Sequence, residues 1–116
     1  PYIINIGIEF AVKVISGADK FGTVDSCINA LGNMYTEGFF IGEGLRIGDI
    51  YQILKEVQGV LDVQRVRLLN KTGVNYSSAT IDINSNLSPD GSELMIPKNA
   101  IVELKFPGTD IIGKAK

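Results

Sequence analysis

Apolar and polar residues alternate near the start of the chain, and this pattern predicts a half-buried strand over residues 6–15. Apolar side chains occupy every second position there: Ile6, Ile8, Phe10, Val12 and Val14. Period-two alternation with β-branched residues is typical of a strand with one buried face. Residues 60–69 are also rich in β-branched residues, but their apolar positions change parity midway. We therefore expect a β-bulge near Gln64 and Arg65 that restores one buried face.

Two segments carry apolar residues at helical spacing. A helix over residues 24–36 is predicted, with Thr23 as its N-cap, Gly38 as its stop, and an apolar stripe of Val24, Cys27, Ile28, Leu31, Met34 and Tyr35. A second helix is predicted over 47–58, ending at Gly59, with a stripe of Ile47, Ile50, Tyr51, Leu54 and Val57. Each stripe is wide enough to cover a sheet.

The remaining segments predict further strands and a tail. Residues 39–41 fit a brief strand, and 74–84 fit a polar strand whose inward side chains are Ala79, Ile81 and Ile83. Residues 94–106 fit a hairpin that turns at Pro97, and residues 107–116 fit an extended tail. This order predicts a single α+β domain over 1–116: a two-layer sandwich of two amphipathic helices on a mainly antiparallel sheet.

Composition then narrows the chemistry. The 116 residues include eleven Lys and Arg against thirteen Asp and Glu, giving a net charge of −2. That balance provides no broad basic surface for nucleic acid, and no apolar run approaches the roughly 20 residues of a membrane span. Histidine is absent and Cys27 is the only cysteine, which excludes every histidine-based catalytic site. Cys27 falls on an apolar helix face and fits an ordinary core thiol.

Individual motifs are each explained better by structure than by chemistry. Gly42, Gly44 and Gly48 have G-x-G-x-x-x-G spacing, which departs from the dinucleotide fingerprint and favours simple chain turns. Acidic residues near loops, among them Glu37, Glu43, Asp82 and Asp90, fit solvated carboxylates, and the run Asp82-Ile83-Asn84-Ser85-Asn86 has no glycine or closing glutamate in calcium-loop register. Ser77-Ser78 has no base to activate it. We therefore expect no enzymatic activity and no catalytic, cofactor or metal residues.

A small basic patch is one alternative kept open. Arg65 and Arg67 share strand parity, and Lys55 lies on the preceding helix. Such a patch suits an acidic partner or a phosphate, although a solvated outer face is the favoured explanation.

Apolar residues outside the predicted core favour protein association. The side chains of Phe39 and Phe40 would point to opposite sides of a short segment. Those of Ile111 and Ile112 would point to opposite sides of the predicted tail. Exposed apolar patches of this kind usually mark association surfaces. We predict these residues, Phe39, Phe40, Ile111 and Ile112, as interface contacts.

The layout of the middle and end of the chain resembles a known family. Residues 57–66 follow the spacing V-x-G-V-x-x-V-x-x-V through Val57, Gly59, Val60, Val63 and Val66, and Pro97-Lys98-Asn99 precedes a last predicted strand. Over about residues 25–106 the chain is similar to the C-terminal part of the baseplate J-like wedge proteins of contractile-tailed phages. Because members of that family are several hundred residues long, the resemblance implies that 1–116 is the C-terminal part of a longer chain.

The resemblance implies a virion structural role and brings no catalytic residues. Such proteins pair and join into a ring of wedges around the tail hub, and they transmit the trigger for sheath contraction. Expected partners are other copies of the chain and other wedge or hub proteins, with no nucleic acid and no membrane. The expected location is the tail baseplate, assembled in the host cytoplasm. The alternative is a ferredoxin-like regulatory domain that binds a small molecule near Gly42–Gly48.

Overall fold

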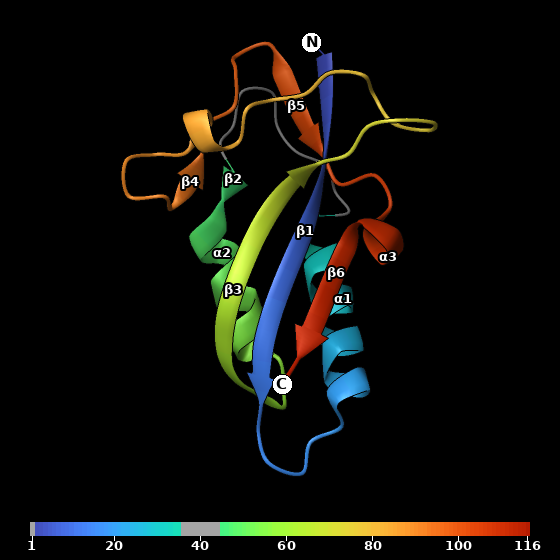
Figure 1. Cartoon of the computed structure of the whole chain (residues 1–116), viewed down its shortest axis with the longest axis vertical. Helices are drawn as coiled ribbons and strands as arrows, with labels where there is room; N and C mark the ends of the chain where they lie inside the picture. Colours follow the sequence, from blue (N-terminus) through green and yellow to red (C-terminus); the bar gives the residue numbers. More distant parts are fainter. Residues whose placement is uncertain (1, 36–44) are drawn as a thin grey trace.

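The architecture is a sheet with two long helices on one face. The computed structural model describes residues 2–35 and 45–116. Its elements, in chain order, are β1 (Tyr2–Val14), α1 (Lys20–Tyr35), β2 (Leu45–Arg46), α2 (Ile47–Glu56), β3 (Val60–Asn70), the 3-10 turn η1 (Asn84–Asn86), β4 (Glu93–Leu94), β5 (Ala100–Glu103), α3 (Pro107–Asp110) and β6 (Ile111–Ala115) (Figure 1). None of the described helices combines the length and apolar composition that crossing a membrane requires.

The long strand β1 organises the sheet. It pairs antiparallel with β3 along one edge, from Ile6 opposite Asn70 to Val14 opposite Val60. Along its other edge it pairs in parallel with β5 at residues 2–5 and with β6 at residues 8–12 (Figure 1). A separate two-stranded ladder joins β2 and β4. The sheet is therefore mixed, although its longest ladder is antiparallel.

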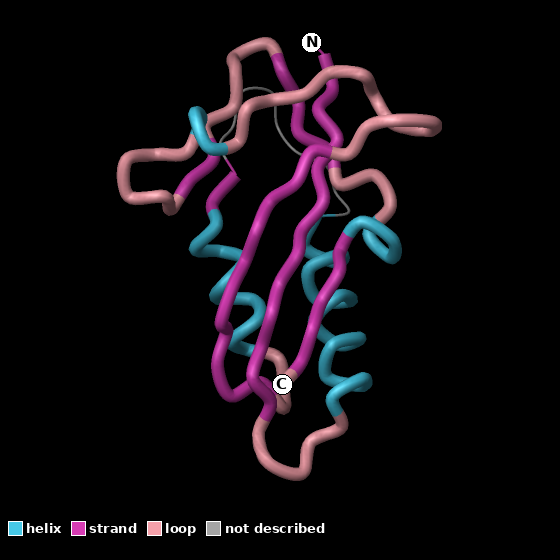
Figure 2. Tube along the Cα trace, viewed as in Figure 1, coloured by secondary structure: helices cyan, strands magenta, loops and turns pink. Residues whose placement is uncertain are grey.

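Both long helices cover the same face of the sheet and confirm the predicted two-layer α+β sandwich. Helix α1 packs behind β6 and helix α2 behind β3 (Figure 2). The alternation of β1 directs its apolar residues into the layer between, where the buried cluster includes Ile6, Ile8, Phe10, Val12, Cys27, Leu31, Ile50, Leu54, Leu68, Val102 and Ile111. The opposite face of β1, β3 and β6 is not covered by either helix (Figure 1).

The predicted bulge in β3 is confirmed, and a second one accompanies it. The pairing passes from Ala11–Arg65 to Val12–Val63, which leaves Gln64 as the extra residue. A further shift leaves Leu61 without an opposing residue in β1. The first bulge brings Val63 onto the buried face, whereas the second leaves the Leu61 side chain 60% exposed.

Helix α1 starts earlier than predicted, and Thr23 is not its N-cap. The helix begins at Lys20, and the Asp19 carboxylate accepts a hydrogen bond from the backbone N–H of Phe21 at 3.1 Å. Thr23 lies one turn inside, where its hydroxyl donates to the Asp19 carbonyl oxygen at 2.8 Å. Two cap-forming residues compete in this stretch, and the earlier one starts the helix.

The predicted strand over 74–84 does not form. Asparagine side chains take the place of a backbone ladder: Asn70 donates to the carbonyl of Ile81 and accepts from its N–H, at 2.7 and 3.1 Å. Buried Asn5 accepts from the N–H of Ser77 at 2.7 Å. Ile81 is nevertheless buried, so the inward apolar positions were predicted correctly while the backbone was not.

The predicted hairpin and tail are also wrong. Strand β4 pairs with β2, and β5 leaves it to pair in parallel with β1. Residues 107–116 are not an extended tail: they form α3 and then β6, which completes the sheet beside β1. Contacts far apart in sequence decided these pairings, and local alternation gives no information about them.

Candidate functional site

The four predicted interface residues have different positions. Phe39 and Phe40 lie outside the described residues. Ile111 is only 1% exposed and belongs to the core, so we withdraw it as a contact residue of the folded chain. Ile112 follows it on the opposite face of β6 and is 47% exposed. Ile112 therefore remains a candidate contact because strand alternation turns it away from the helices.

A surface groove lies beside β6, where the first turn of α1 approaches the last residues of the chain. Its volume is about 430 Å³, and its apolar lining comes from Phe21, Val24, Gly113 and Ala115. Phe21 stands out because its side chain is 90% exposed. An aromatic ring left in water next to an apolar groove is a feature of association surfaces.

In the described part of the chain, the backbone of β6 is paired on one side only. Lys116 donates its N–H to the carbonyl of Val12 at 3.0 Å, and Val14 donates to the carbonyl of Lys116 at 2.9 Å. Backbone directions alternate along a strand, so the N–H and C=O groups of Gly113 and Ala115 point away from β1. Within residues 2–35 and 45–116, β6 pairs with β1 and no strand lies on its outer side.

Positive charge surrounds the groove. Lys20, Lys114 and Lys116 line it, and none of the described residues that line it is acidic. On the open sheet face, Ala11 lies opposite Lys114 on one side and Arg65 on the other. Lys114 and Arg65 are exposed on this open sheet face, whereas Lys20 is exposed at the start of α1 on the helix side.

The predicted basic patch of Lys55, Arg65 and Arg67 is confirmed for the two arginines and wrong for the lysine. Arg65 and Arg67 do share the open sheet face, opposite Ala11 and Glu9. Arg67 lies 4.0 Å from Glu9, an exposed ion pair of little energetic weight. Lys55 is on α2, which covers the other face, so it does not join them.

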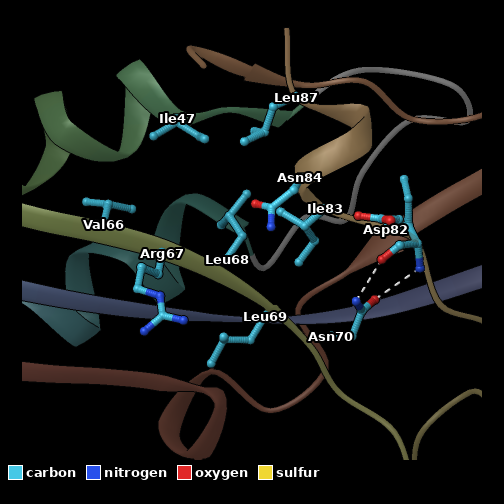
Figure 3. Close-up of a pocket in the computed structure, with 11 residues that line it drawn as sticks. Ile47, Val66, Arg67, Leu68, Leu69, Asn70, Asp82, Ile83, Asn84 and Leu87 are labelled. Carbon is cyan, nitrogen blue, oxygen red and sulfur yellow. Dashed lines mark hydrogen bonds between the residues drawn. The ribbon is translucent and has the colours of Figure 1, made fainter.

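A second cavity of about 460 Å³ lies at the opposite edge of the sheet. Side chains from β3, from the start of α2 and from the segment around η1 surround it (Figure 3). More of its lining surface is polar than apolar, although seven of its lining side chains are apolar: Ile47, Val66, Leu68, Leu69, Ile81, Ile83 and Leu87. Arg67, Asn70, Asp82 and Asn84 supply polar groups around it (Figure 3).

Most of the polar groups of this cavity already serve the fold. The Asn70 amide is bonded to the backbone of Ile81, as the dashed lines of Figure 3 show. Asp82 accepts a hydrogen bond from the N–H of Ser85 at 3.2 Å. Across the described ranges, no group of three or more His, Cys, Asp and Glu side chains is placed to hold a metal ion.

Cys27, Tyr76 and Asp90 have shifted pKa values, and burial or a hydrogen bond within the fold explains each shift. Burial raises the pKa of the Cys27 thiol to about 11, as expected of a core thiol. Asp110 is buried and accepts a hydrogen bond from the Tyr76 hydroxyl at 2.6 Å; that bond raises the pKa of Tyr76. Hydrogen bonds from Ser88 and then Ser92 lower the pKa of Asp90 to about 2.

Phe21 is the functional candidate that the sequence analysis missed. The predicted helix began after it, so its position relative to the apolar stripe was not considered. With the helix started at Lys20, Phe21 lies three residues before Val24 yet outside the buried face. The sequence did contain a signal for it: Phe21 follows the N-cap residue Asp19 closely and lies at the edge of the apolar stripe of the helix.

No family model matches the chain, and no curated protein matches it either.

Proposed function

We propose that this chain is a structural interaction domain that joins protein subunits through the β6 edge. One observation carries the proposal: the exposed ring of Phe21 stands beside an apolar groove whose strand, β6, has no strand partner on its outer side among the described residues. The exposed side chain of Ile112 lies on the same strand. Edge strands with apolar surroundings are templates for pairing with another chain.

The resemblance of residues 25–106 to baseplate wedge proteins suggests the assembly to which the chain belongs. We place the chain in the baseplate wedge of a contractile-tailed phage, as the C-terminal part of a wedge subunit. Its partners are then further copies of the chain and other wedge or hub proteins. Its role is to hold the ring together and to pass on the trigger for sheath contraction, without catalysis. An α+β domain with a free strand edge suits this role because added strands make strong, geometrically defined joints.

The test is to find the assembly in which the chain occurs. We expect antibodies against the chain to label the baseplate end of phage tails, and the mass of the isolated assembly to correspond to several subunits. Photo-crosslinking from position 21 should yield defined adducts within such particles. The matched control is position 95, because Met95 is 52% exposed and directly follows β4, which pairs with β2 and not with the sheet that contains β6. A chain found only as a free monomer contradicts the proposed function.

A second candidate function rests on the cavity between α2, β3 and η1. Its volume falls in the range of small-molecule sites, and several apolar side chains line it beside a larger polar surface. It lies at the start of α2, next to the position expected for the ferredoxin-like alternative. Thermal-shift screening against nucleotides and amino acids tests it. A ligand at 100 times its Kd stabilises the folded state by about 2.7 kcal/mol.

A further inference from the structure

Building on the proposed role in joining subunits, we infer that β6 accepts an extended segment of a partner protein as an added strand. We further infer that this segment alternates apolar and acidic residues. The inference combines the direction of the β6 backbone, the two faces of the sheet at that edge, and the charge around the groove.

The backbone of β6 offers the hydrogen bonds. Its residues Gly113 and Ala115 turn their N–H and C=O groups outward, as the bonds of Lys116 to Val12 and Val14 require. Both residues are partly exposed and line the groove, so water or another chain reaches them. An incoming strand would satisfy these groups in the manner of β-augmentation.

The two faces of the sheet differ at the β6 edge, and this difference determines which side chains the partner strand should carry on each face. On the helix side, an added strand would lie over the groove formed with Phe21 and Val24, where apolar side chains fit. On the open side it would lie beside Ile112 and Lys114, both exposed. Because side chains of a strand alternate between faces, the partner should be apolar at every second position.

Charge decides what occupies the positions between. Lys20, Lys114 and Lys116 line the groove without an acidic neighbour among the lining residues. Lys114 lies on the open face, across Ala11 from Arg65. Glutamate or aspartate on that face of the partner would complement these cations. A second copy of β6 would instead bring lysines against lysines, an arrangement that is unfavourable across neighbouring strands.

The probe for this site is a capped eight-residue peptide that alternates Val and Glu, titrated into the whole chain at pH 7. We expect hydrogen exchange of the Gly113 and Ala115 amides to slow by about tenfold or more when it binds. Exchange at Ile112 and Lys114 should change little, because their amides already face β1. The comparison peptide alternates Val and Lys and should not bind.

Charge reversal of β6 provides the matched variants. Lys114→Glu combined with Lys116→Glu should weaken the Val–Glu peptide by about tenfold and favour the Val–Lys peptide instead. Lys55→Glu combined with Lys98→Glu changes the net charge equally at exposed sites that do not line the groove. This control should bind like the original chain. Phe21→Ser should weaken peptide binding both in the original chain and in the charge-reversed variant. Because Phe21 is exposed, this substitution should leave the fold intact.

Two results would overturn the inference. One is binding that leaves the Gly113 and Ala115 amides unprotected, or that treats both peptides alike. The other is a dimer of the chain that protects the same amides without peptide, since the occupant would then be a second copy. Particle reconstruction separates the two proposals: subunit contacts elsewhere on the domain would retain the structural role and reject the β6 site.

Discussion

The two long edges of the sheet are finished in different ways. At the β3 edge, bulges at Gln64 and Leu61 interrupt the ladder, and Asn70 fixes the segment around Ile81 beside the strand. At the β6 edge the strand is short and regular, and its outer backbone has no strand partner in the described parts of the chain. The exposed ring of Phe21 lies beside the second edge.

The two edges therefore differ in how open they are to association with another chain. Bulges, charged side chains and covering segments are the usual devices that prevent strands from pairing with other chains. The β3 edge has all three, with Arg65 and Arg67 as its charges. The β6 edge lacks a covering segment among the described residues and adds an apolar groove, so an incoming strand would meet less obstruction there.

The largest expected effect tests how firmly β6 is built into the core. A Cβ at Gly113 would stand 2.1 Å from Cζ of Phe10. Gly113→Ala should therefore lower the free energy of unfolding by about 2–3 kcal/mol through overpacking, as measured by urea denaturation. The control is Gly108→Ala, where nothing lies within 4 Å, and it should change stability by less than about 0.5 kcal/mol. Equal losses in both variants would refute this packing.

The next effect concerns the cover of the β3 edge. Asn70→Ala removes both bonds to Ile81 and should lower the free energy of unfolding by about 1–2 kcal/mol. Hydrogen exchange should accelerate in residues 79–87 and stay unchanged in β6. Asn29→Ala, on an exposed position of α1, serves as the control and should be near neutral. Acceleration that spreads equally to β6 would show that the two edges are not independent.

Cys27 reports on the contact between α1 and the β6 side of the sheet. A thiol pKa of about 11, raised from 9.0, leaves about a hundredfold less thiolate at pH 8. Iodoacetamide should therefore modify the folded chain far more slowly than the chain in urea, and Gly113→Ala should accelerate the reaction. Similar rates for folded and unfolded chains would be inconsistent with a buried thiol.

The same thiol gives a pH dependence at alkaline pH. Its folded pKa lies above the unfolded value, so the folded state prefers the protonated thiol. Its contribution to stability should be complete below about pH 9 and should decrease as the pH rises toward 11. Cys27→Ala should remove this part of the alkaline decline, which urea denaturation at several pH values measures.

The smallest effect lies in the loop before β4. Hydrogen bonds from Ser88 and Ser92 hold the pKa of Asp90 at about 2, below its ordinary 3.8. The contribution of Asp90 is therefore present above about pH 3.8 and lost as the pH falls toward 2. Because Asp90 is exposed, the gain in stability is slight. An NMR titration that returns an ordinary aspartate pKa would contradict these bonds, and Asp90→Asn should abolish the local transition.

Periodicity predicted the parts of the fold that one element decides by itself. The inward faces of β1 and α2, and the bulge at Gln64, follow from the spacing of apolar residues. The start of α1 was misplaced because Asp19 and Thr23 are both good caps. The strand over 74–84 failed because two asparagine side chains replaced its ladder, and alternation does not reveal that. Of the candidate site, Ile112 was among the predicted residues and Phe21 was not. Ile111 was predicted as an interface contact but is buried in the core.

Local sequence patterns were enough to predict an α+β domain with two amphipathic helices and a core thiol, and the absence of histidine excluded histidine-based catalysis. Each of these depends on residue type and local spacing, because burying the apolar face of a single helix or strand stabilises that element directly. Three features could be seen only once the chain was folded: β5 and β6 run parallel to β1, residues 111–115 form a strand at the edge of the described sheet, and Phe21 stands beside that strand. Strand pairing depends on contacts between residues up to about a hundred positions apart, and their energies are not encoded in any local pattern.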